Sequence, residues 1–183
     1  MNQTTQTETR DQYPIPGVDP SAPYVLQRDE GDHRHFLNHL ATRKVAAGDN
    51  GAITAVEFVQ PKGFGPPLHC HDDEDEIVVV LEGEIAFRSG DNESVGRAGS
   101  VAYLPHGVPH SFQVLSDEAR MIAITASVNG VKPEFDQMVA ALGAPSSTPT
   151  QPEPVEINPG EVAEVNARYG IEILGPPPAP LPG

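Results

Sequence analysis

The sequence has few of the residues that form disulfides, bind polyanions or cross membranes. Its single cysteine, Cys70, excludes an internal disulfide framework and predicts a reducing, cytoplasmic location. Only 11 Lys and Arg stand against 26 Asp and Glu, and the formal net charge of -15 argues against nucleic acid and anionic membranes as partners. No apolar run approaches the roughly 20 residues that span a bilayer. Residues 1–10 lack the basic start and apolar middle of a secretory signal.

Glycine and proline, by contrast, are abundant. The 17 Gly and 20 Pro among 183 residues favour short strands and turns over long helices. Strand-like segments begin near residue 34 and recur to about residue 127, with turn signals between them. Residues 51–60 and 118–127 alternate, and residues 77–81 form a short apolar run suited to a strand buried on both faces. This rhythm predicts one all-β domain, a sandwich or a barrel.

The chain is predicted to have three parts. Residues 1–33 are polar and proline-containing, and we expect an N-terminal arm that packs late or not at all. Residues 34–130 form the barrel. Residues 131–183 are predicted to be a C-terminal helical segment with a proline-rich tail. Its expected elements are a helix over 132–142 ended by Gly143, a linker over 146–159, a second helix over 160–169, and an extended tail over 176–183.

Two histidines and a carboxylate lie close together in a segment that prolines keep extended. The prolines at 66–67 argue against a helix, and in a strand the side chains of His69 and His71 point to the same side. Glu76 follows shortly after, and His110 belongs to a later strand. Three imidazoles and one carboxylate suit a divalent transition metal and leave positions open for substrate or O2. The sequence therefore predicts a metal site.

Other candidate ligands fit this pattern less well. The acidic residues 72–75 are interpreted as a solvated loop, although the spacing of Asp75 is also tolerated. His33 and His35 imitate the histidine pair but lack a following carboxylate and a glycine frame. Three further residues are given structural or surface roles: His39 and Cys70 in packing, and His106 in an exposed turn.

The residues around the predicted ligands resemble the two sequence motifs of the cupins. The matching positions are Gly63, His69, His71, Glu76 and Gly83 in the first motif, and Gly99, Pro105, Gly107 and His110 in the second. Val114 replaces the final Asn of the second motif, which is not a metal ligand in the family. The resemblance covers residues 34–130. It implies an all-β cupin jelly-roll β-barrel, followed here by the C-terminal helices, with the metal held by the three histidines and Glu76.

Strand parity predicts which side chains point into the barrel. Glu57 and Arg120 mark the outer faces of their strands, so the residues on either side of each point inward. Five inward residues near the ligands are interpreted as substrate-binding: Thr54, Val56, Val78, Phe112 and Met121. Phe58 and Val80 are assigned to the core. This apolar wall favours an aromatic substrate over a phosphorylated sugar or a dicarboxylate, which would need Arg or Lys.

Two segments, residues 63–69 and 167–178, resemble single-domain cupins of the quercetin 2,3-dioxygenase type. The resemblance implies a flavonol substrate, ring opening by O2 and release of carbon monoxide. We expect Glu76 to act as the catalytic base that takes the proton of the flavonol 3-hydroxyl. One divalent transition metal per chain is expected: nickel, cobalt, manganese or iron, with nickel favoured by intrinsic affinity over manganese.

Two alternative functions remain open from the sequence. One is another metallo-cupin enzyme, a dioxygenase or an isomerase, that acts on a different small molecule. The other is a non-catalytic ligand-binding cupin. In each case a homodimer is expected by analogy with other cupins.

Overall fold

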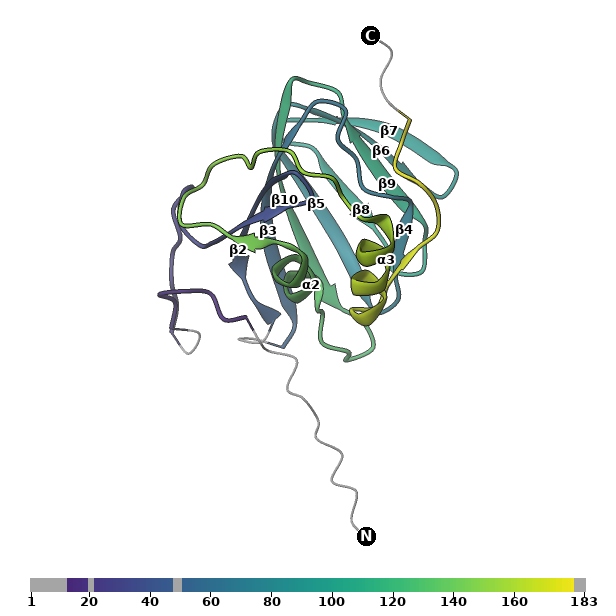
Figure 1. Cartoon of the computed structure of the whole chain (residues 1–183). Helices are drawn as coiled ribbons and strands as arrows, with labels where there is room; N and C mark the ends of the chain where they lie inside the picture. Colours follow the sequence, from purple (N-terminus) through teal and green to yellow (C-terminus); the bar gives the residue numbers. More distant parts are fainter. Residues whose placement is uncertain (1–12, 20–21, 48–50, 180–183) are drawn as a thin grey trace.

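Two antiparallel sheets face each other in the structure, a computed structural model that describes residues 13–19, 22–47 and 51–179 (Figure 1). The larger sheet has the strand order β11-β1-β2-β3-β10-β5-β8. Its strands are β1 (Asp32–Phe36), β2 (His39–Val45), β3 (Ile53–Pro61), β5 (Glu74–Glu82), β8 (Val101–Leu104), β10 (Glu118–Ser127) and β11 (Ala144–Pro145). The smaller sheet has the order β12-β4-β9-β6-β7. Its strands are β4 (His69–His71), β6 (Glu84–Ser89), β7 (Asn92–Arg97), β9 (His110–Val114) and β12 (Ile171–Ile173).

The chain crosses repeatedly between the sheets, which gives a jelly-roll barrel. From β3 to β10 it alternates between the larger and smaller sheets, apart from the β6–β7 hairpin. All pairings among the described strands are antiparallel. The predicted all-β cupin jelly-roll with C-terminal helices is confirmed.

Glycines shape two of the turns that hold this arrangement. Gly83 joins β5 to β6 with a φ of 84°, and a Cβ there would lie 2.5 Å from the Glu118 carbonyl oxygen. Only glycine fits such a conformation and such a close approach. Gly107, with a φ of 68°, donates its backbone N–H to the His71 carbonyl at 2.8 Å. This bond ties the turn before β9 to β4, and so joins the strand of His110 to the strand of His69 and His71.

The space between the sheets holds the hydrophobic core, with inward positions as strand parity predicts. Val56, Val78 and Ala123 are completely buried. The prediction that residues 77–81 are buried on both faces is wrong, because Ile77 and Val79 are only half-buried on the outer face of β5. No described helix is long and apolar enough to cross a membrane.

The N-terminal segment departs from the prediction of an arm that packs late or not at all. Within the described residues, Ile15 is 4% exposed and the Tyr13 carbonyl accepts a hydrogen bond from Arg43 at 2.5 Å. Lys44 donates to the carbonyls of residues 27, 28 and 30. Strand β1 also starts at Asp32, two residues before the predicted barrel boundary. Residues 1–12 and 20–21 lie outside the described part of the chain.

The C-terminal segment contains both expected helices. α2 runs from Phe135 to Leu142 and ends at Gly143, and α3 runs from Pro159 to Arg168. Asn158 caps α3 by accepting backbone N–H bonds through its side chain. α2 and α3 contact each other (Figure 1). The strands β11 and β12 were not predicted. They add a short edge strand to each sheet.

A buried ion network joins α2 to the larger sheet. The Arg43 guanidinium, fully buried, donates to Asp32 at 2.6 Å and to Asp136 at 2.7 Å.

Replacing Asp136 by Ala is expected to lower the free energy of unfolding by about 3 kcal/mol, because it leaves a buried charge partly uncompensated. Urea denaturation measures the change. The exposed pair Lys62–Asp117 offers the control: Asp117→Ala should change stability by less than about 0.5 kcal/mol. Equal losses in the two variants would contradict this account.

Candidate metal centre

Four predicted ligands meet between the two sheets. The ligand atoms of His69, His71, Glu76 and His110 all lie within 4.8 Å of one another. His69 and His71 project together from β4, as residues two apart in a strand must. His110 opens β9 directly opposite His69 in the register. Glu76 comes from β5 in the facing sheet. The barrel therefore brings together side chains that are up to 41 positions apart in the numbering, from His69 to His110.

Backbone carbonyls orient two of the imidazoles. His69 Nδ1 lies 2.8 Å from the Pro67 carbonyl oxygen, and His110 Nδ1 lies 3.0 Å from that of Val108. A carbonyl oxygen only accepts, so each Nδ1 carries a hydrogen, and in the neutral form of each ring Nε2 has the lone pair. His71 Nε2 and His110 Nε2 are buried and have no hydrogen-bond partner among the described residues. Buried nitrogens with free lone pairs and an adjacent carboxylate fit a divalent transition metal.

The electrostatics of the cluster keep two ligands ready to bind a cation. Burial alone would raise the pKa of Glu76, but the neighbouring imidazoles, above all His110, lower it to about 2. The His110 Nε2 atom lies 3.3 Å from Glu76 Oε2, and among the neighbouring imidazoles this contact lowers the pKa of Glu76 most. Burial lowers the pKa of His69 to about 3, with the other imidazoles acting in the same direction. At neutral pH Glu76 is therefore ionised and His69 is neutral.

If the cluster holds a metal ion, His110 makes the affinity for that ion depend on pH. Burial lowers its pKa, but the contacts with the Glu76 carboxylate and the Val108 carbonyl outweigh burial and raise it above 6.5. A metal must displace that proton, so affinity should fall as the pH falls through the raised pKa, by about tenfold per pH unit. The decline should begin at a higher pH than for an ordinary histidine. Chelator competition between about pH 8 and pH 5 measures it, and an affinity constant over that range would contradict the prediction.

The acidic run after the histidine pair is not simply a solvated loop. Asp72 and Asp73 are exposed, as predicted, but Glu74 is buried at 5% exposure. Its Oε1 accepts the backbone N–H groups of residues 134 and 135 at the start of α2, at 2.5 and 3.1 Å. Its Oε2 lies 3.6 Å from His71 Nδ1. Glu74 therefore connects the histidine–carboxylate cluster to α2, and the loop interpretation was wrong for this residue.

The remaining candidates lie outside the cluster. Asp75 accepts hydrogen bonds from His106 and Tyr103, and these bonds, the His106 contacts foremost, lower the pKa of Asp75 to about 2. His106 is exposed in its turn, as predicted. His33 is buried and hydrogen-bonds Thr42, so it forms part of the β1–β2 pairing. His35 and Cys70 are also absent from the cluster.

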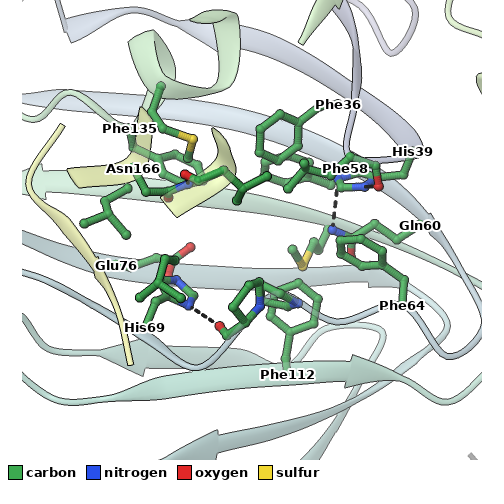
Figure 2. A pocket seen from close by; sticks show the side chains of 18 residues that line it. Phe36, His39, Phe58, Gln60, Phe64, His69, Glu76, Phe112, Phe135 and Asn166 are labelled. Atoms are coloured by element: carbon green, nitrogen blue, oxygen red, sulfur yellow. Dashed lines mark hydrogen bonds between the residues drawn. The ribbon is translucent and has the colours of Figure 1, made fainter. Parts of the chain in front are cut away.

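A cavity of about 70 Å³ adjoins the cluster (Figure 2). Its lining is mainly aromatic and aliphatic, and among the described residues no Lys or Arg contributes. It consists of Phe36, Leu37, His39, Phe58, Gln60, Phe64, Pro66, Pro67, His69, Glu76, Phe112, Met121, Phe135, Met138, Val162, Asn166, Ile171 and Ile173. The apolar character expected from strand parity is present.

Individual lining residues differ from the prediction. Phe112 and Met121 line the cavity as expected. Val56, Val78 and Thr54 do not line it: the two valines belong to the core, and Thr54 is buried with its hydroxyl 2.7 Å from that of Thr125. These three positions point inward but are absent from the lining of this cavity, and their assignment to substrate binding stays a prediction. Phe58, assigned to the core, belongs to the core cluster and also lines the cavity.

The sequence interpretation missed the residues that close the cavity from outside the central strands. Val162 and Asn166 come from α3, and Ile171 and Ile173 come from β12. The alternation of Ile171 and Ile173 was a signal for a strand. His39, interpreted as structural, also lines the cavity.

The jelly-roll barrel has the architecture of a cupin, and its histidine–carboxylate cluster could hold a metal ion. Consistent with this, the family model described as the cupin domain matches residues 55–126, which include all four ligands. The chain therefore carries a cupin domain over these residues.

One curated protein is similar to part of this chain. Quercetin 2,3-dioxygenase of Bacillus subtilis (strain 168) is 29% identical over 108 residues, which cover 58% of this chain and 32% of that protein. The matched stretch thus spans about a third of the length of the relative.

Solved structures with a similar arrangement include two cupins. A Cupin 2 conserved barrel domain protein from Salinispora arenicola has a TM-score of 0.49 and 25% identity, covering 60% of this chain and 93% of that one. An RmlC-like cupin from Shewanella frigidimarina has a TM-score of 0.49 and 18% identity, covering 58% and 90%. At these TM-scores the structures add no argument on activity.

Proposed function

We propose that this protein is a metal-dependent dioxygenase that opens the ring of a quercetin-type flavonol with O2 and releases carbon monoxide. The observation that carries the proposal is the placement of the three-histidine, one-glutamate cluster at one end of an apolar cavity. The similarity to quercetin 2,3-dioxygenase supports the choice of reaction.

The four clustered side chains would hold the metal, and each is suited to a defined role. A divalent ion there would supply Lewis-acid chemistry, increasing the acidity of a hydroxyl group close to it. Glu76 would take the proton of the flavonol 3-hydroxyl at a carboxylate oxygen. A carboxylate whose pKa is about 2 is a weak base, so proton transfer to it depends on that increased acidity. The electron-rich flavonolate is then the form that reacts with O2.

The aromatic lining would protect this reactive form. Phe58, Phe112 and Phe135 present rings to the cavity, and Phe112 is 9% exposed. Few polar groups are present to retain water beside the substrate. Excluding water limits proton return to the flavonolate and hydrolysis of the products.

The cavity must enlarge before a flavonol can enter. Its 70 Å³ is far below the roughly 300–1,000 Å³ of typical ligand pockets. α3 and β12 cover it, and β12 is an edge strand of three residues paired only with β4. Displacing these two elements would open the cavity without breaking the pairings among β3, β5 and β10. The C-terminal segment is therefore the part of the lining that we expect to move when a flavonol enters.

The test combines quercetin, O2 and protein loaded separately with nickel, cobalt, manganese or iron. We expect O2 consumption together with carbon monoxide, with nickel or cobalt bound more tightly than manganese. Protein that retains its metal but releases no carbon monoxide with any of the four would overturn the flavonol assignment. The small cavity would then favour the second candidate, a metallo-cupin dioxygenase or isomerase with a smaller substrate.

Three properties remain predictions that belong to this proposal. Nickel as the resident metal is expected from intrinsic affinity. A homodimer is expected from analogy with other cupins, and the cytoplasmic location from the single cysteine. Metal analysis tests the nickel assignment, and sedimentation of the full chain tests the homodimer.

A further inference from the structure

A hydrogen-bonded polar pair lies at the end of the cavity away from the metal centre. His39 and Gln60 stand together in Figure 2, whereas His69 and Glu76 occupy the opposite end. His39 is fully buried and Gln60 is 2% exposed. The metal-centre residues do not explain this pair, because neither His39 nor Gln60 belongs to the cluster.

The protein fixes the state of the His39 imidazole. Nδ1 lies 3.2 Å from the Leu37 carbonyl oxygen, which only accepts, so Nδ1 carries the hydrogen. Burial lowers the pKa of His39 to about 3 although that hydrogen bond opposes the shift. Aromatic rings surround it: Phe36, Phe58 and Phe64 have ring centroids at 5.4, 5.5 and 4.3 Å. His39 is therefore a neutral ring whose Nε2 is an acceptor.

This acceptor determines which way the Gln60 amide points. Gln60 Nε2 lies 3.4 Å from His39 Nε2, and the amide N–H2 group is the only donor on that side chain. If the amide were turned so that Oε1 faced His39, the lone pairs of Gln60 Oε1 and His39 Nε2 would face each other. The Gln60 Oε1 atom is consequently turned away from His39. It is buried and has no hydrogen-bond partner among the described residues.

We propose that Gln60 Oε1 accepts a hydrogen bond from a hydroxyl group at the end of the substrate farthest from the metal. This inference rests on the proposed function and specifies its substrate class: aromatic molecules with one oxygen function at the metal end and a hydroxyl on a distant ring. A hydroxyl fits better than an ammonium group because Glu76, the one carboxylate in the lining, lies at the other end. Gln60 is thus a specificity-determining residue and His39 a positioning residue.

The buried acceptor should discriminate against substrates that cannot pair with it. A flavonol without a distal hydroxyl would enclose Gln60 Oε1 without a partner, which opposes binding. We expect an affinity difference of about tenfold between flavonols with and without that hydroxyl. The apolar walls themselves do not distinguish the two ligands, since both present the same ring system.

The experiment uses the full metal-loaded chain and three probes. These are 3-hydroxyflavone, 3,7-dihydroxyflavone and 3,4′-dihydroxyflavone, so that the added hydroxyl is on either outer ring. Dissociation constants are measured without O2 by flavonol fluorescence, and O2 consumption is measured separately. One dihydroxy probe should bind about tenfold more tightly than 3-hydroxyflavone in the unmodified protein, and within about twofold of it in Gln60→Met.

Gln137 provides a matched control. It is also 2% exposed with an unpartnered Oε1, but it lies in α2 and does not line the cavity. Gln137→Met should keep the tenfold preference. If Gln60→Met fails to fold, His39→Phe serves instead: it retains a ring but removes the acceptor that orients Gln60, and should weaken the preference.

The two readouts separate this inference from the proposed function. A hydroxyl preference that disappears in Gln60→Met, without O2 consumption by any probe, would support the distal acceptor and overturn the dioxygenase assignment. O2 consumption with equal affinities for all three probes would overturn the distal acceptor alone. A preference that survives in both Gln60→Met and His39→Phe would also overturn it.

Discussion

Glu76→Gln should retain the metal but lose about 10²- to 10⁴-fold in turnover of flavonol. The glutamine side chain keeps an oxygen beside the three imidazoles, so a ligand atom remains at that position. It cannot accept the proton of the substrate hydroxyl, because an amide is not a useful base at neutral pH. The loss should therefore appear in kcat at saturating flavonol. Steady-state kinetics with metal content measured on the same samples gives the result.

Glu57→Gln is the control for removing a buried carboxylate. Glu57 lies on the outer face of β3, where Arg120 donates to both its oxygens, at 2.8 and 3.0 Å. It lies outside the cavity and the cluster. The kcat for flavonol, expressed per folded and metal-containing chain, should be unchanged in this variant. Turnover that persists in Glu76→Gln with metal bound would show that Glu76 is not the base.

Replacing His71 by Ala should reduce metal affinity by at least about 100-fold and remove flavonol turnover with it. His71 is 1% exposed, and the cluster contains no fifth His, Cys, Asp or Glu among the described residues. Loss of a group that merely supports a ligand already costs about 10- to 100-fold. The nickel dissociation constant is measured by calorimetric titration of the metal-depleted protein.

His35→Ala is the matched control for this second prediction. His35 belongs to the other His-x-His pair, in β1, and lies outside the cluster and the cavity. Its replacement should leave nickel affinity within about twofold of the original value. Similar losses of affinity in both variants would indicate that the metal binds elsewhere.

The pairing of His69 with His71 in the cluster could be predicted because it follows from local geometry. His69 and His71 share a side of any extended strand, and the prolines before them exclude a helix. Glu76 and His110 required the cupin motif, since spacing alone does not tell which distant strands become neighbours. In the structure β9 places His110 opposite His69, and β5 brings Glu76 from the facing sheet.

The closure of the cavity could not be predicted in the same way. Strand parity places Val56 and Val78 inward, but it does not determine how deep they lie behind other side chains. The cover depends on α3 and β12, whose docking is a tertiary contact between segments about 100 residues apart, such as Ile171 beside His71. The contact of His39 with Gln60 was also missed, because it forms between two different strands, β2 and β3. Likewise, Glu74 becomes buried only because α2 begins beside it.

The most direct measurement is the metal content of the protein as isolated, determined by mass spectrometry on the full chain. The arrangement of three lone-pair nitrogens and one ionised carboxylate predicts about one divalent transition metal ion per chain, lost in His71→Ala and retained in His35→Ala. Protein that contains no such ion, and binds none when nickel, cobalt, manganese or iron is added, would contradict the account.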